Sequence, residues 1–280
     1  MRVGLLGASG FIGQHLAERL RARGDEVASA TLRDPAAAAA QLAGCHTIVN
    51  LAGEPVAQRW TRQAKERIAS SRVEAPRAFM AALARGAERP TAYISASAIG
   101  FYGSSEQATF TEESPPGDDF LADVCVRWEA QAQRACELGM RTALVRTGLV
   151  LALDGGALKQ LLPPFRLGLG GVVGSGKQWY SWIHIDDVVG IYIAAIDGLD
   201  GVLNATAPEP VTNAEFTRTL GAALHRPTIL PVPPIALRAM LGEGAGIVLL
   251  GQRVIPRRTQ SLGYRFAYES LGDALRNLLG

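Results

Sequence analysis

Cysteine and histidine are scarce in this 280-residue chain, which contains three cysteines and four histidines. Cys45, Cys125 and Cys136 are too few and too scattered for a disulfide framework, and no histidine pair has the spacing of a zinc site. The sequence therefore predicts neither a disulfide nor a metal site. Sparse, unpaired thiols suit a reducing compartment, so we expect a cytoplasmic protein.

Excess charge and long apolar runs are also missing. Lys and Arg number 28 and Asp and Glu number 26, so a net charge of +2 gives no electrostatic case for binding nucleic acid or a membrane surface. No uncharged apolar run reaches the roughly 18 residues of a membrane span, and the N-terminal apolar stretch is too short for a signal peptide. The 48% of hydrophobic residues can bury a large core, as one domain or as one domain with a smaller appendage.

A glycine-rich turn near the N-terminus is the most informative feature present. Apolar residues 2–6 precede Gly7, Gly10 and Gly13, and an amphipathic helical pattern follows. In the dinucleotide fingerprint, the first glycine turns the chain, the second lets the backbone approach a pyrophosphate, and the third lets the helix pack on the sheet. The helix N-terminus adds a partial positive charge. The residues expected to bind the cofactor here are Gly7, Ser9, Gly10, Phe11, Ile12 and Gly13.

Short apolar strands alternate with helical patterns over the first 150 residues. Strands are expected at 26–31, 47–51, 92–95 and 141–151, and helices at 36–40, 60–71, 73–87 and 120–138. This alternation predicts an α/β fold with a Rossmann-type, doubly wound parallel sheet. Ligands of such sheets lie at the carboxyl ends of the strands, so Leu51, Ala52 and Gly53 are expected to line the cofactor site.

Glycine and proline interrupt the regular pattern in the second half of the chain. We expect residues 1–207 to form the nucleotide-binding domain, with parts of 155–183 contributing to a substrate cleft. Residues 208–280 are expected to form a smaller, mainly helical α/β domain on the substrate side. Its helices are predicted at 213–224, near 235–250 and at 269–279.

The end of the second strand bears on the choice of cofactor. NAD-preferring sites place a carboxylate there to bind the ribose 2′-OH, whereas this stretch reads Ser29-Ala30-Thr31-Leu32-Arg33. A guanidinium binds a 2′-phosphate in a bidentate manner, so Thr31 and Arg33 are predicted to contact it. Asp34 would partly offset Arg33, and the alternative for Arg33 is an ordinary solvated loop residue. NADP(H) is favoured over NAD(H).

Several segments together resemble the extended-type short-chain dehydrogenases/reductases, the nucleotide-sugar epimerase group. They are Gly7-x-x-Gly10-Phe11-Ile12-Gly13, Asn50–Gly53, Ser95–Gly103 and Trp182–Asp187. Other segments resemble an atypical, epimerase-like subfamily with its own C-terminal domain of unknown function. They are Asn50–Pro55, Phe120–Cys125, Trp128-Glu129, Pro164–Gly171, Gly174–Gly176, Val211–Phe216 and Gly251–Pro256, and with the first set they span nearly the whole chain.

The resemblance implies that the usual catalytic pair is missing. In extended dehydrogenases a tyrosine and a lysine, four residues apart on a helix, carry the proton chemistry, and an upstream serine orients the substrate oxygen. Counting back from Glu129, which resembles the helix glutamate of the family, places Leu121 at the tyrosine position and Cys125 at the lysine position. Leucine cannot transfer a proton.

Four other side chains are candidates for function. Ser97 would polarise the substrate oxygen, with Ala98 as an alternative occupant of the serine position and a backbone-bonded hydroxyl as the simpler role. Tyr102 is a substitute acid or a pocket wall, and Cys125 is a nucleophile or a packing residue. Arg72 stands where the wider family carries asparagine; it contacts a cofactor phosphate or ribose, holds an anionic substrate, or forms a surface ion pair.

Two further segments have expected roles. The glycine-rich segment 168–176 is expected to form a substrate lid whose aromatic walls are Trp179, Tyr180 and Trp182. The acidic stretch 112–119 is expected to be a solvated loop that ends, at Asp118 or Asp119, in the N-cap of the next helix.

Two functions follow from these features. The first is an NADP(H)-dependent, epimerase-like oxidoreductase that acts on a carbonyl, an alcohol or a nucleotide-sugar-like small molecule. The second is a non-catalytic NADP(H)-binding regulator or redox sensor, which the loss of the tyrosine and lysine favours. Related folds often dimerise through helices that flank the sheet, and a homodimer is expected by this analogy alone.

Overall fold

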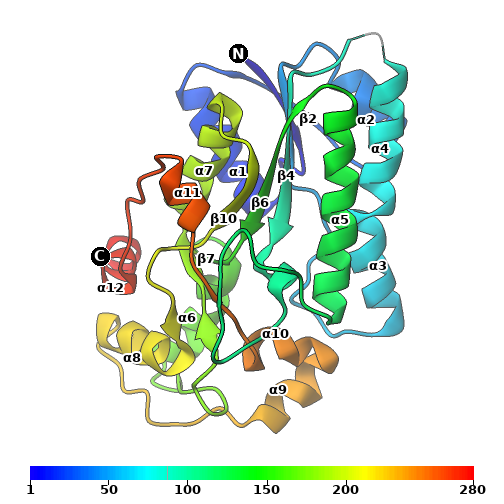
Figure 1. Ribbon diagram of the computed structural model, residues 1–280. Helices are drawn as coiled ribbons and strands as arrows, with labels where there is room; N and C mark the ends of the chain where they lie inside the picture. The colour runs from blue at the N-terminus through cyan, green and yellow to red at the C-terminus, as the bar shows by residue number, and fades with distance from the viewer. Residues whose placement is uncertain (87) are drawn as a thin grey trace.

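The computed structural model describes residues 1–86 and 88–280, and a six-stranded parallel sheet forms its centre (Figure 1). In sheet order the strands are β10 (Gly201–Ala205), β6 (Arg141–Thr147), β4 (Ala92–Ala98), β3 (Thr47–Asn50), β1 (Arg2–Leu6) and β2 (Glu26–Ala30). The chain winds outward from β1 to β2 and then crosses to the other side of β1 to form β3. This reversal opens a crevice at the carboxyl ends of β1 and β3, which is the binding position in doubly wound sheets.

Helices cover both faces of this sheet, as Figure 1 shows. One face carries α1 (Phe11–Ala22) and α7 (Ile185–Asp197); the other carries α2 (Pro35–Gln41), α3 (Arg62–Arg72), α4 (Glu74–Arg85) and α5 (Phe120–Glu137). Side chains of β1 alternate between the two faces, since Val3 and Leu5 pack with α1 and α7 whereas Leu6 packs with α2 and α4. The predicted Rossmann-type α/β fold is confirmed. Position 87, the predicted end of the fourth helix, lies outside the described residues.

The predicted strand 141–151 is wrong as a single element. Strand β6 ends at Thr147, and β7 (Leu149–Leu151) leaves the central sheet to pair with β9 (Trp182–His184). Gly148 lies at the break, where a Cβ atom would overlap the carbonyl oxygen of Ser181. Close approach of two backbones therefore requires glycine here, and this contact could not be read from the local pattern.

The C-terminal region folds back over the carboxyl ends of the strands (Figure 1). Helices α6 (Gly156–Arg166), α8 (Asn213–Ala223) and α12 (Leu271–Leu279) share a separate apolar cluster. The predicted helix near 235–250 is instead three short pieces, α9 (Pro234–Leu241), η2 (Glu243–Ala245) and α10 (Gly246–Leu249), because Gly242 has a φ of +60° that ends the first of them.

Short strands join this region to the rest of the molecule. Strand β11 (Val211–Thr212) pairs with β8 (Trp179–Tyr180), and β12 (Arg253–Val254) pairs with β5 (Thr109–Phe110). Trp182 is fully buried among α6, α8 and α12, and its indole N–H donates to the Glu209 carbonyl oxygen. The prediction that Trp182 forms a wall of an open lid is therefore wrong.

Within the described residues, no helix is long and apolar enough to cross a membrane. Across the same part of the chain, no three His, Cys, Asp or Glu side chains gather closely enough to hold a metal ion.

Candidate functional site

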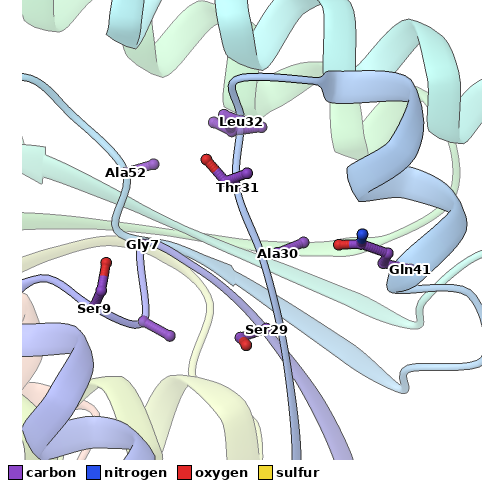
Figure 2. Close-up of a pocket in the computed structure, with 9 residues that line it drawn as sticks. Gly7, Ser9, Ser29, Ala30, Thr31, Leu32, Gln41 and Ala52 are labelled. Atoms are coloured by element: carbon purple, nitrogen blue, oxygen red, sulfur yellow. The ribbon is translucent and has the colours of Figure 1, made fainter.

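A cavity of about 350 Å³ lies at the crevice between the ends of β1, β2 and β3. Its lining residues are Gly7, Ala8, Ser9, Ser29, Ala30, Thr31, Leu32, Gln41 and Ala52. Figure 2 shows the turn with Gly7 and Ser9 on one side of the cavity and the end of β2, with Ala30 and Thr31, on the other. Four residues predicted for cofactor binding, Gly7, Ser9, Thr31 and Ala52, thus line one cavity.

The glycine-rich turn has the geometry that an anion site needs. Gly7 has a φ of +85°, and a Cβ atom on it would lie 2.9 Å from the backbone nitrogen of Ala52. A Cβ atom on Gly13 would overlap the Gly7 carbonyl oxygen, so α1 can sit directly on the turn only with glycine there. No side chain of the described residues caps α1, and its first turn holds no acidic residue. The N–H groups at the start of α1 therefore remain available for a phosphate.

The loop that follows β7 covers this turn from the side. The Phe11 ring packs so closely against Gly155 that a Cβ atom there would overlap it, and a Cβ atom on Gly156 would lie 3.1 Å from the ring. His15, one helical turn further on, meets the Phe11 ring edge-on at 5.6 Å, and its Nε2 is hydrogen-bonded to Asp154 Oδ2 at 2.8 Å. These contacts hold the partly buried Phe11 ring against the loop, so its backbone N–H, rather than its ring, is the part suited to bind a phosphate.

The structure limits the competition between Asp34 and Arg33 at the end of β2. Asp34 is the N-cap of α2, where its side chain accepts a hydrogen bond from the Ala37 N–H at 3.0 Å. Arg33 is exposed, and it forms no ion pair within the part of the chain that the structure describes. It does not line the cavity itself but follows directly on Thr31 and Leu32, which do. The offset that Asp34 would impose on Arg33 is therefore weakened by the capping bond.

Arg72 lies beside the segment that follows β3, next to Gly53 and Glu54. Its Nη1 group donates to the carbonyl oxygens of Glu54, at 2.9 Å, and Ile68, at 3.3 Å. The guanidinium carbon lies 5.1 Å from the centre of the Trp128 ring, and a Cβ atom on Gly53 would lie 2.9 Å from that carbon. Burial lowers the pKa of Arg72 from its usual high value, because desolvation disfavours the charged form. Gly53 thus leaves the space through which the guanidinium extends.

The Ser97 hydroxyl belongs to a buried hydrogen-bond network. The Ser97 hydroxyl donates to Glu129 Oε1 at 2.6 Å, and Arg146 donates to both oxygens of the same carboxylate at 2.8 Å. Ser97, Glu129 and Arg146 are each no more than 5% exposed. Two parallel N–H···O bonds to a buried carboxylate form a strong, geometrically specific pair. The Ser97 proton is therefore directed to Glu129.

Tyr102 belongs to the same network. Its hydroxyl accepts a hydrogen bond from Arg146 at 2.9 Å and donates one to Asn204 Oδ1 at 2.7 Å. Burial raises the pKa of Tyr102 to about 12, although the neighbouring Arg146 charge opposes the shift. Sequence reasoning missed the roles of Arg146 and Asn204. A charged residue inside the buried strand β6 was the available signal, since a charge in such a place needs a partner.

The helix α5 presents apolar groups where the family dyad would stand. Leu121 packs against Gly100 of the 3₁₀ turn η1 (Ile99–Tyr102), where a Cβ atom would lie 3.3 Å from the Leu121 Cβ. Cys125 is 3% exposed, and its Sγ lies 3.8 Å from the Ala98 carbonyl oxygen. Burial, aided by the nearby Glu129 charge, raises the pKa of Cys125 to about 12. This thiol is protonated at neutral pH and packs as a core residue.

Alkylation checks this description of the cysteines. At pH 8 a thiol with a pKa near 12 is deprotonated in only about one molecule in ten thousand, so Cys125 is expected to resist iodoacetamide in the folded protein. Cys45 is buried with a raised pKa and should resist as well, whereas the exposed Cys136 should react and serves as the internal control. Peptide mass mapping measures each site. Rapid labelling of Cys125 in folded protein would contradict the assignment.

The acidic stretch contains a buried carboxylate, contrary to the solvated loop predicted for it. Glu112 is 7% exposed and accepts hydrogen bonds from the backbone N–H groups of Asn204, Arg258 and Thr259, and from the Thr259 hydroxyl, at 3.0–3.2 Å. It thereby fastens α11 (Arg257–Ser261) to β10. At the end of the stretch Asp119 caps α5 by accepting from the Ala122 N–H at 2.9 Å, as predicted.

A parallel sheet with a glycine-rich turn at its switch point defines a nucleotide-binding α/β protein. The chain belongs to the NAD dependent epimerase/dehydratase family, whose description matches residues 3–206, and residues 232–278 match a domain of unknown function, DUF1731. The human epimerase family protein SDR39U1 is 40% identical over 294 residues, with both chains covered completely. An Arabidopsis thaliana chloroplastic homologue of SDR39U1 is 41% identical over 304 residues, covering all of this chain and 87% of the relative.

Solved structures agree with this assignment. A crystal structure of human SDR39U1 (isoform 2) with NADPH has a TM-score of 0.92 at 38% identity and covers 100% of this chain and 99% of its own. MoeE5 in complex with UDP-glucuronic acid and NAD has a TM-score of 0.79 at 20% identity, with coverage of 100% and 98%, and shows likeness of fold alone. The resemblance to an atypical, epimerase-like group with its own C-terminal domain is confirmed.

Proposed function

We propose that this protein binds NADP(H) in the cavity at the ends of β1, β2 and β3. The observation that carries the proposal is the uncapped start of α1, set on a glycine turn that opens on this cavity. The choice of NADP(H) is supported by the β2 end, which has no carboxylate, and by the unpaired Arg33 beside it among the described residues. The similar human SDR39U1 was crystallised with NADPH.

The chain offers groups for each part of such a cofactor. The backbone from Gly7 to Gly13 would hold the pyrophosphate, and Thr31 and Arg33 would hold the ribose 2′-phosphate. Residues 51–53, which follow β3, would line the side of the cofactor that points toward β4. When bound, the nicotinamide supplies or accepts a hydride. The proposed activity is therefore that of an oxidoreductase acting on a small carbonyl, alcohol or nucleotide-sugar-like molecule.

A second function is favoured by one specific observation. By the family resemblance Leu121 and Cys125 stand at the positions of the tyrosine and lysine, and the hydroxyls of Ser97 and Tyr102 are engaged in the buried network. A protein that kept the cofactor site and lost proton transfer would act as an NADP(H)-binding regulator or redox sensor. Turnover of bound NADPH with any carbonyl acceptor separates the enzyme from the regulator.

The cofactor preference is tested by calorimetric titration with NADPH and NADH. The Arg33→Ala variant is expected to bind NADPH about tenfold more weakly, a loss of about 1.4 kcal/mol, because the 2′-phosphate loses its guanidinium partner. NADH affinity should stay unchanged, since NADH has no 2′-phosphate. Arg62→Ala, which removes an exposed arginine from the N-terminus of α3, is the matched control.

Three results bear on this proposal. An equal loss of affinity for NADPH and NADH in Arg33→Ala would show that Arg33 does not bind the 2′-phosphate. Tighter binding of NADH than of NADPH by the unaltered protein would overturn the choice of cofactor. Failure of both nucleotides to bind would overturn the proposed function as a whole.

A further inference from the structure

The side of the crevice that faces α5 holds a cation but offers no free acid among the groups that the family resemblance points to. Leu121 has no proton to give, and the Cys125 thiol points to the Ala98 carbonyl oxygen. The Ser97 and Tyr102 hydroxyl protons are donated to Glu129 and Asn204. A hydride acceptor bound here would meet none of these groups as a proton donor.

Arg72 supplies a different kind of group at the same place. Of its nitrogens only Nη1 hydrogen-bonds within the described residues, so Nε and Nη2 keep their donors, and the side chain forms no ion pair with a described carboxylate. The guanidinium packs against the Trp128 ring and extends past Gly53, which has no Cβ atom to block it. It also lies close enough to Cys125, at the lysine position, for its charge to act on that thiol. A fixed cation with unused donors is suited to hold a negatively charged oxygen.

A guanidinium stabilises an anion but does not serve as its acid. Arginine stays protonated in proteins, so Arg72 could not deliver a proton to an alkoxide, the strongly basic product of hydride addition to a simple ketone. The conjugate acid of an alkoxide is about as weak an acid as water, whereas the conjugate acid of a phenolate has a much lower pKa of about 10. An acceptor that becomes a phenolate-like anion therefore needs only electrostatic stabilisation in the site.

We propose, on the basis of the NADP(H) function above, that the site reduces quinones or comparably conjugated carbonyls and that Arg72 is a catalytic residue. From bound NADPH a hydride would pass with its electron pair to one oxygen of the quinone, where it would form an O–H bond and leave NADP⁺. The π electrons of the conjugated ring would move onto the other carbonyl oxygen, which becomes the phenolate of the hydroquinone monoanion. Arg72 donates a hydrogen bond to that oxygen, and water protonates it after release.

The test follows NADPH oxidation with a benzoquinone or with cyclohexanone as acceptor, after subtraction of the reaction without protein. The quinone is expected to be reduced and cyclohexanone not. Arg72→Met should lower kcat about a hundredfold, the usual effect of losing one oxyanion donor, with the calorimetric Kd for NADPH changed by less than about threefold. Arg72→Lys, which keeps the charge, should recover part of kcat and covers the case in which Arg72→Met does not fold.

The control and the pH profile separate a chemical role from a structural one. Arg62→Met removes an exposed arginine at the other end of α3 and should leave kcat unchanged. With the unaltered protein, kcat for the quinone should be flat from about pH 6 to about pH 9, because no side chain titrates as the acid.

Each contrary result has one meaning. Reduction of cyclohexanone as fast as the quinone would reveal a protein acid and overturn the proposal. If Arg72→Met binds NADPH and NADH equally more weakly and keeps the same kcat, Arg72 only holds the cofactor. That result would also overturn the proposal. Tight NADPH binding with no reduction of either acceptor would overturn it in favour of the regulator, whereas absence of NADPH binding would overturn the proposed function first.

Discussion

Replacing Arg146 by methionine is expected to destabilise the folded protein by about 3–5 kcal/mol, because it leaves the Glu129 carboxylate buried without its cation. The Glu129 oxygens now accept two hydrogen bonds from Arg146, and the same guanidinium lies 3.4 Å from the centre of the Phe101 ring. Urea unfolding followed by circular dichroism measures the change in the free energy of unfolding.

Two companion variants define what this loss means. Arg127→Met breaks an exposed i,i+4 pair with Asp123 on α5 and should change the free energy of unfolding by less than about 1 kcal/mol. The double variant Glu129→Gln/Arg146→Met removes the stranded charge and should recover part of the loss. If the double variant is as unstable as the losses in Arg146→Met and in the single variant Glu129→Gln added together, the two side chains are not coupled and the network does not stabilise the core in this way.

Gly13→Ala is expected to weaken NADPH binding by at least about a hundredfold. The added Cβ would overlap the Gly7 carbonyl oxygen and lie 2.9 Å from the Ala8 Cα, and both are backbone atoms that cannot rotate aside. Helix α1 must then shift away from the turn, and with it the N–H groups that would hold the pyrophosphate. Loss of two hydrogen bonds to a charged group, each of about 1.5–3 kcal/mol, gives an effect of this size.

Calorimetry with NADPH measures this loss, and a thermal melt without nucleotide reports the accompanying change in stability. Gly272→Ala is the matched control because Gly272 is half-buried in α12, and the nearest atom to a new Cβ there is the flexible Arg276 side chain at 3.7 Å. That variant should bind NADPH normally and be slightly more stable, since alanine favours a helix. Wild-type affinity in Gly13→Ala would show that the pyrophosphate does not sit on this turn.

Features encoded by neighbouring residues were predictable from the sequence. The turn from Gly7 to Gly13 and the strand before it form one local pattern, and the structure places them at the switch point of the sheet. The N-cap of α5 at Asp119 and the doubly wound sheet follow equally from short-range spacing.

Features that depend on partners distant in the sequence could not be predicted from it. The break at Gly148 is caused by Ser181, and the Ser97 hydroxyl is engaged by Glu129, 32 residues further on. Each of these residues looks ordinary beside its neighbours in the chain. A hydroxyl or carboxylate changes its role when a partner reaches it through the fold, and local spacing carries no record of that partner.

The carboxylate of Glu112 also sets an order of events during synthesis. Its four donors belong to Asn204, Arg258 and Thr259, and the nearest of these follows it by 92 residues. While the nascent chain is shorter than 258 residues, this carboxylate has one of those hydrogen bonds at most and cannot be buried at low cost. The strands up to β6 can pair before this point, but the loop that holds Glu112 can close only after Arg258 and Thr259 have been added to the chain. Truncation before Arg258 would therefore leave the Glu112 carboxylate without most of its donors. The packing around β10, which lies well before the cut in the sequence, would loosen as a result.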